Sequence, residues 1–245
     1  MALPKLNVPV YEAILPSTEK VIKYRPFLVK EEKILLTAME SEDEKSISNA
    51  IKQIINNCVQ GKLDVDRLPT FDIEYLFLRL RAKSVGEKAT IGLKPHPCSQ
   101  NNGELCEKTT EVEINLEEVQ VIKNEKHTNK IMLADNIGIM LTYPNIENIQ
   151  SIMKGAAATS QTEQGMNLIK DSVSMIFTEE ETHEKDSFAE EELEEFFDSL
   201  TSDQFIKIRE FFETMPQLKH TVKYKCSTCG EDKETMVQGL NSFFG

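Results

Sequence analysis

The sequence predicts an α+β fold in which helical blocks surround a small antiparallel β module. Apolar residues recur at helical spacing in several segments, including 44–59 and 72–82. Short extended segments occur in two regions that are far apart in the chain, 89–116 and 220–237. Helices and strands therefore fall into separate blocks, unlike the regular alternation that accompanies a parallel sheet.

The first third of the chain is expected to hold a β hairpin followed by helices. Within residues 1–30, Tyr11, Ala13 and Leu15 alternate with other residues before a turn at Pro16, which predicts an N-terminal β hairpin. Residues 31–86 form the predicted helical segment, with helices expected over 31–38, 44–59 and 72–82.

The remaining residues divide into a β module and an insertion. Residues 87–143 are expected to form a β module with the first cysteine pair, and residues 218–245 complete it with a second cysteine knuckle. Between them, residues 144–217 are predicted to be a helical insertion. Within the insertion, Gly155–Thr162 is the predicted linker, and helical spacing continues from Met166 to Ile176.

Composition narrows the class of partner. The 245 residues carry a formal charge of −13, and the sequence pI is about 4.9. An acidic chain gains nothing from the counterion release that drives non-specific nucleic-acid binding, and anionic membrane surfaces repel it. No apolar run approaches the roughly 20 residues of a membrane helix, and the first residues lack a secretory signal. We therefore expect protein partners, no nucleic acid and no membrane; the oligomeric state is not predicted.

Four of the five cysteines predict a metal site. Cys226 and Cys229 are two residues apart and Gly230 follows them, which is the spacing of a zinc knuckle. Cys98 and Cys106 also lie between extended segments, so the two pairs together predict a split zinc ribbon with a structural Zn²⁺. Four protein ligands leave no open position for a water nucleophile.

Two features leave alternatives open at this site. Seven residues separate Cys98 from Cys106, more than the usual two to four, and His96 is a substitute ligand in the same loop. The competing interpretation is that the four cysteines are scattered and bind no metal. Cys58 lies on the apolar stripe of its predicted helix, where a buried small hydrophobe is expected.

The chain is not expected to be an enzyme. It contains no glycine-rich phosphate loop, no nucleophile elbow and no metalloprotease helix. His127 and His183 are expected to be solvated surface residues. Residues 178–195 contain ten acids and one lysine beside phenylalanines, a pattern typical of the wet face of an amphipathic helix. The phenylalanines are interpreted as core or, alternatively, as a helical hairpin that docks into a partner.

Four groups of residues, in this order and spacing, resemble the hub and hub-assembly proteins of T4-type phage baseplates. They are Tyr24–Lys33; Phe71–Leu76 with Leu80–Glu87; Asn136–Gly138 with Tyr143–Pro144; and the cysteine knuckle with Gly239–Phe244. The resemblance spans nearly the whole chain. The longer loop between Cys98 and Cys106 departs from the tighter first knuckle of that family.

The resemblance implies a non-enzymatic hub component or hub-assembly factor of a contractile-tailed phage. Its partners would be other tail and baseplate hub proteins. It would act in the host cytoplasm during assembly and, if it stays in the particle, in the tail baseplate. No active site is implied. The alternative hypothesis is a zinc-ribbon regulator that binds nucleic acid or a polymerase, for which the lysines near Cys226 are the only basic cluster.

Overall fold

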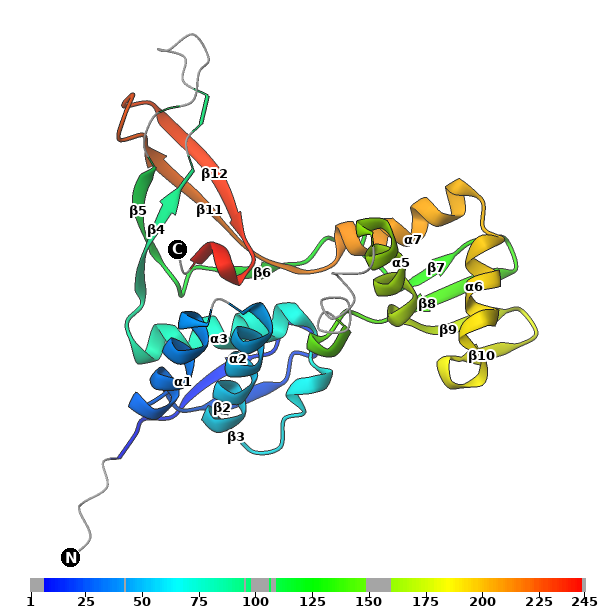
Figure 1. Ribbon diagram of the computed structural model, residues 1–245, viewed down its shortest axis with the longest axis horizontal. Coiled ribbons are helices and arrows are strands. Elements are labelled where there is room, and N and C mark those ends of the chain that lie inside the picture. The colour runs from blue at the N-terminus through cyan, green and yellow to red at the C-terminus, as the bar shows by residue number, and fades with distance from the viewer. Residues whose placement is uncertain are drawn as a thin grey trace, which may run out of the picture. The chain divides into compact units, whose positions relative to one another are not determined.

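The computed structural model describes residues 7–41, 43–94, 96–97, 106, 109–148 and 160–243 and shows the predicted α+β class (Figure 1). The chain forms two compact units. The first contains Met1–Val65, Phe71–Ile122 and Gln217–Gly245, and the second contains Asp66–Thr70 and Lys123–Pro216. The long central segment of the second unit is thus inserted into the first.

The N-terminal part of the first unit combines a small sheet with three helices. The sheet is antiparallel with the order β1-β2-β3. In chain order, the elements of this region are β1 (Tyr11–Ile14), β2 (Val21–Tyr24), α1 (Val29–Glu40), α2 (Glu44–Cys58), β3 (Val59–Gln60), the 3-10 turn η1 (Val65–Arg67) and α3 (Thr70–Ser84). The Asp43 side chain caps α2 by accepting a hydrogen bond from the Ser46 backbone, and the apolar stripe of that helix buries Ile54, Ile55 and Cys58.

A buried ion pair anchors the start of α1. Arg25 Nη2 donates to Glu31 Oε1 at 3.0 Å and to the carbonyl of Asn57, also at 3.0 Å. Glu31 is fully buried, and its Oε2 accepts from the backbone N–H of Leu28 at 2.9 Å. Burial acts to raise the pKa of Glu31, but the hydrogen bonds from Arg25 and Leu28 outweigh it and the pKa is lowered. The Tyr24–Lys33 segment therefore serves the fold.

The β module of the first unit comes from two distant parts of the chain. β4 (Lys88–Leu93) pairs with β5 (Thr110–Asn115) in a two-stranded antiparallel sheet. A second sheet has the order β12-β11-β6, formed by β6 (Gln120–Ile122), β11 (Gln217–Lys225) and β12 (Asp232–Gln238). In Figure 1 these strands appear in green for β4 to β6 and in orange to red for β11 and β12.

Pairing between β6 and β11 closes the base of the insertion. Ile122, the last residue of β6, lies opposite Gln217, the first residue of β11. The chain therefore leaves the first unit and returns to it at neighbouring positions. After β12, the turn η4 (Leu240–Phe243) packs back on α3, where the Leu240 N–H donates to Glu74 Oε1 at 3.2 Å.

The second unit has its own sheet and core. Its strands follow the order β10-β9-β8-β7 and are antiparallel. The elements are β7 (Lys130–Met132), β8 (Ile137–Leu141), α5 (Gln161–Ser172), β9 (Val173–Thr178), β10 (Thr182–Glu184), the 3-10 turn η3 (Lys185–Ser187), α6 (Glu190–Asp198) and α7 (Ser202–Thr214). Apolar residues from β7, β8 and the three helices form one buried cluster, which includes Ile139, Leu141, Phe197 and Phe211.

Two details differ from the sequence-based expectations. The helix expected to run to Ile176 ends at Ser172, and Val173–Thr178 is strand β9, because it pairs along β8 and carries β-branched and aromatic residues suited to a sheet. The strands within 130–141, which were expected to join the β module of the first cysteine pair, belong instead to the sheet of the second unit: β8 pairs with β9, and β7 pairs with β8. Of the predicted linker, residues 155–159 lie outside the described residues, and Ser160 caps α5.

Candidate metal centre

The turn between β11 and β12 is a cysteine knuckle. The Cys226 N–H donates to the carbonyl of Glu231, and the Gly230 N–H donates to the carbonyl of Cys226, both at 2.9 Å. Gly230 has a φ of +72°, in the left-handed region that glycine adopts without steric cost. This tight turn holds Cys226 and Cys229 at one end of the β11–β12 hairpin.

The opposing half of the site comes from the segment that joins β4 to β5. His96 follows β4, and Cys106 precedes β5. The Cys106 N–H donates to the carbonyl of His96 at 2.9 Å, so one backbone hydrogen bond closes the base of the intervening loop. Residues that are ten positions apart in the sequence thereby become neighbours.

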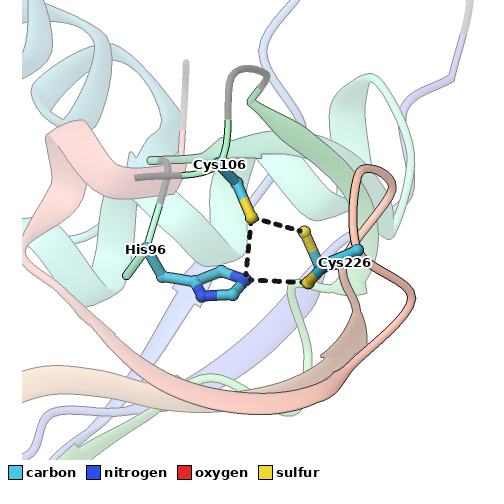
Figure 2. Close-up of side chains that lie close together, drawn as sticks. His96, Cys106 and Cys226 are labelled. Carbon is cyan, nitrogen blue, oxygen red and sulfur yellow. Dashed lines mark hydrogen bonds between the residues drawn. The ribbon is translucent and has the colours of Figure 1, made fainter. Parts of the chain in front are cut away.

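Four side chains converge where the two halves meet (Figure 2). Cys106 Sγ lies 3.7 Å from Cys226 Sγ and 3.8 Å from His96 Nε2, and Cys229 Sγ lies 3.9 Å from the same nitrogen. All four ligand atoms are within 4.8 Å of one another. Since a disulfide bond is about 2.05 Å long, the sulfurs at 3.7 Å are not bonded. Cys106 and Cys226 are 4% and 3% exposed, whereas His96 and Cys229 are partly exposed.

Hydrogen bonds orient the groups of the cluster. His96 Nδ1 lies 2.8 Å from the carbonyl of Pro97, which can only accept, so Nδ1 carries the proton and Nε2 presents its lone pair to the three sulfurs. The hydroxyl of Thr110, a buried residue, donates to Cys226 Sγ at 3.9 Å and accepts from the Ser227 N–H at 3.2 Å. Such outer contacts are a usual feature of metal sites.

The local electrostatics favour a thiolate at Cys226. Hydrogen bonds from the backbone N–H groups of Cys229 and Thr228 lower the pKa of Cys226 to about 5. By contrast, burial raises the pKa of Cys58 to about 11. Cys58 is 1% exposed in the core of the first unit, as expected for a small hydrophobe. The chemistry open to the cluster is the binding of a metal ion by three thiolates and one imidazole.

The predicted ligands are placed as follows. The structure brings Cys106, Cys226 and Cys229 together, and His96, the substitute ligand, joins them. Cys98 lies outside the described residues. The signal that points to His96 is its position shortly after the end of β4, which is similar to the position of Cys226 after β11.

Other residues considered for function have structural roles. His127, expected to be solvated, packs instead against Tyr143 and Phe211 at ring-centroid distances of 5.5 and 5.0 Å, and burial lowers its pKa. Its Nδ1 lies 2.9 Å from Thr214 Oγ1. The phenylalanines near the acidic run belong to the core of the second unit: Phe197 and Phe211 are buried, and Phe188, Phe196, Phe205 and Phe212 pack against them.

Several residues of the four groups that carry the family resemblance, or contacts made by them, also support the fold. Besides the Arg25–Glu31 pair, fully buried Asp72 accepts from the backbone N–H of Ser17 at 3.0 Å. Gly138 lies opposite Phe177 in the β8–β9 pair, and the ring leaves no room for a side chain there. Glu31, Asp72 and Gly138 thus have structural roles within the chain.

Fold and site define an α+β protein of two units, the first of which contains a cluster of one histidine and three cysteines that could bind a metal ion. The chain belongs to the family of the T4 bacteriophage base plate protein, whose family model matches residues 8–245. No curated protein and no solved structure matched the chain. Within the described part of the chain, no helix has the length and apolar character needed to cross a membrane.

Proposed function

We propose that the protein is a non-enzymatic hub component or hub-assembly factor of a contractile-tailed phage baseplate, and that it acts through contacts with other hub proteins. The observation that carries this proposal is the family match over residues 8–245, nearly the whole chain. The polar motif residues whose contacts are described above, including Glu31, Asp72 and Glu74, contact other parts of the same chain. These polar residues support the fold, so a role in assembly would depend on other residues at the surface of the protein.

Charge is distributed unequally and suits a protein that is free before it docks. Residues 123–216, the insertion, contain 19 acidic and 8 basic residues, a net charge of −11, whereas the whole chain has −13. The rest of the chain is therefore nearly neutral. Strong like charge keeps a protein soluble and monomeric. The acidic insertion favours an assembly factor that exists free in the host cytoplasm before it joins the hub.

The N-terminal region supplies the apolar surface for a partner. Among the described residues, twelve large apolar side chains are well exposed, and seven of them lie between Val10 and Met39. Ile14 and Val21, each 57% exposed, are cross-strand neighbours on β1 and β2. Exposed apolar patches mark protein contact sites.

The unpaired edge of strand β1 indicates which kind of partner segment would cover this apolar surface. The Leu15 N–H bonds to the carbonyl of Lys20, so the alternation of an antiparallel ladder directs the backbone groups of Glu12 and Ile14 away from β2. Within the described residues, β1 pairs only with β2. An open edge binds another strand, and we assign the occupant as an extended, apolar segment of a hub protein.

The role of the metal in this proposal is structural. A zinc ribbon, here split by the insertion, would be completed by Zn²⁺ held between the β4–β5 and β11–β12 hairpins. Tetrahedral sites of sulfur and nitrogen ligands are typical of zinc. Because His96 and Cys106 lie before the insertion and Cys226 and Cys229 after it, the ion would tie the two parts of the first unit together. Four protein ligands leave no site for catalysis.

The alternative, a regulator that binds nucleic acid, gains no support from the lysines near the knuckle. Lys223 lies 3.8 Å from Glu234, and Lys233 lies 2.7 Å from Glu231. Lys225 is the cross-strand neighbour of Asp232. Acids therefore accompany these cations and reduce the positive field that a phosphate backbone requires.

Co-purification tests the proposed function. The tagged chain would be produced together with the baseplate proteins of its phage and isolated at moderate salt. We expect one or more hub proteins to co-elute in a fixed ratio and a salt-dependent gel shift with DNA to be absent. A chain that elutes alone in the presence of every baseplate protein would contradict the proposal.

A further inference from the structure

We infer that the metal centre is a site of three cysteines and one histidine, in which His96 Nε2 is the fourth ligand and Cys98 is not required. This inference deepens the proposed structural role of the metal. It concerns the ligand set of the isolated chain, and it can therefore be tested without any baseplate protein. The side chains of His96, Cys106, Cys226 and Cys229 form one group, and Figure 2 labels the first three of them.

The separations of the ligand atoms match those of tetrahedral zinc. With Zn–S bonds of about 2.3 Å and Zn–N bonds of about 2.05 Å, tetrahedral angles place two sulfurs about 3.8 Å apart and a sulfur and a nitrogen about 3.6 Å apart. The observed distances are 3.7 Å for Cys106 to Cys226, and 3.8 and 3.9 Å from His96 Nε2 to Cys106 and Cys229. No ligand pair exceeds 4.8 Å, so the longest closes by about 1 Å around an ion.

The imidazole is held in the tautomer that binds metal. Nδ1 donates its proton to the carbonyl of Pro97 at 2.8 Å, which leaves the lone pair of Nε2 directed at the sulfurs. The backbone of the same residue accepts from the Cys106 N–H. His96 is therefore fixed at its ring and at its carbonyl, as a ligand should be.

The two halves of the site also share a local plan. In each half, one ligand follows the end of a strand: Cys226 comes directly after β11, and His96 comes three positions after Leu93, the last residue of β4. The carbonyl of that ligand accepts a backbone hydrogen bond in each half, from the Cys106 N–H at His96 and from the Gly230 N–H at Cys226. Thr110 joins the halves because it belongs to β5 and contacts both Cys226 and Ser227. His96 thus occupies the position at which a ribbon places its first ligand.

The ligand chemistry restricts the ion. Thiolates and imidazole are soft to borderline donors, which favour Zn²⁺ and its spectroscopic substitute Co²⁺ over Mg²⁺ or Ca²⁺. Binding would convert the three thiols to thiolates and release their protons to solvent. No carboxylate takes part in the cluster of described residues, which further separates this site from a calcium site.

Two matched variants, His96→Ala and Cys98→Ala, test the assignment. The whole chain is purified under reducing conditions, its zinc content is measured, and the metal-free form is titrated with Co²⁺. Cobalt in a tetrahedral thiolate site gives visible bands whose energy falls when sulfur replaces nitrogen. We expect one zinc per wild-type chain, an unchanged spectrum and affinity for Cys98→Ala, and an affinity for His96→Ala lowered by more than about 100-fold, since even outer contacts cost 10- to 100-fold.

A third variant, His96→Cys, keeps the test decisive if His96→Ala does not fold. It should bind Co²⁺ with bands at lower energy than wild type, because a sulfur replaces the nitrogen. The assignment is overturned if Cys98→Ala loses the ion or shifts the bands while His96→Ala does not, and also if wild type binds neither zinc nor cobalt. Failure of the chain to bind hub proteins would leave these readouts unchanged, so the two proposals fail separately.

Discussion

Replacement of Glu31 by alanine should destabilise the first unit by about 3–4 kcal/mol. Removing one partner of a buried ion pair costs roughly 3–5 kcal/mol because the other charge is left uncompensated. The side chain of Arg25 is 19% exposed and keeps the carbonyls of Pro26 and Asn57 as acceptors, which places its share at about 3 kcal/mol. Loss of the cap on Leu28 N–H adds up to about 1 kcal/mol.

Urea unfolding followed by circular dichroism measures this loss. The transition assigned to the first unit should move to lower urea for Glu31→Ala. Glu31→Gln should lose less, since an amide oxygen can still cap the helix. Glu12→Ala is the matched control, because Glu12 pairs with Lys23 at 3.4 Å and its side chain is 60% exposed; it should change stability by less than about 0.5 kcal/mol. A loss below about 1 kcal/mol for Glu31→Ala would refute the reasoning.

The same residue gives a pH dependence with a definite sign. The pKa of Glu31 is lowered in the folded chain, so its stabilisation is present above the unfolded value of about 4.3. It is lost as the pH falls through the folded value. Glu31→Gln should therefore be less sensitive than wild type to acid below about pH 4. An identical acid limb for the two proteins would contradict the assignment.

Three further changes test other parts of the account. In a pull-down titration, Ile14→Lys should weaken binding to hub proteins by about 10-fold without unfolding the chain, since burying the exposed half of the Ile14 side chain is worth about 1–1.5 kcal/mol. The control is Ile206→Lys in α7, where the side chain is 48% exposed; this variant should bind normally. Thr110→Val should lower Co²⁺ affinity by about 10-fold while the visible spectrum keeps its shape, and unchanged affinity would remove Thr110 from the site. Gly138→Ala should destabilise the second unit by about 1–3 kcal/mol because the new methyl overlaps the Phe177 ring, and Phe177→Leu should recover part of the loss in thermal unfolding.

Much of the local structure followed from sequence patterns because it depends on near neighbours. The apolar stripe of α2, for example, can be recognised within one segment of the chain. The strands β4, β5, β11 and β12 were also predicted, since each alternates and borders a turn or a cysteine. The α+β class follows from how these blocks are separated.

Pairing between distant segments could not be read in the same way. Val173–Thr178 continues the spacing of a helix, and only its pairing with β8 makes it a strand. The burial of His127 depends on Tyr143 and Phe211, which are remote in sequence. For the candidate metal site, the spacing of Cys226 and Cys229 predicted that both are ligands. The place of His96 depends instead on the hydrogen bond from the Cys106 N–H to the His96 carbonyl, which joins residues ten positions apart.

The most direct test of the central claim is the number of assembled hubs in cells infected by a phage that lacks this gene. Hub complexes would be separated by sedimentation and counted by electron microscopy. The account predicts that hubs are lost, and that the wild-type chain supplied from a plasmid restores them while Ile14→Lys does so poorly. Normal numbers of complete hubs without the gene would contradict the role in baseplate assembly.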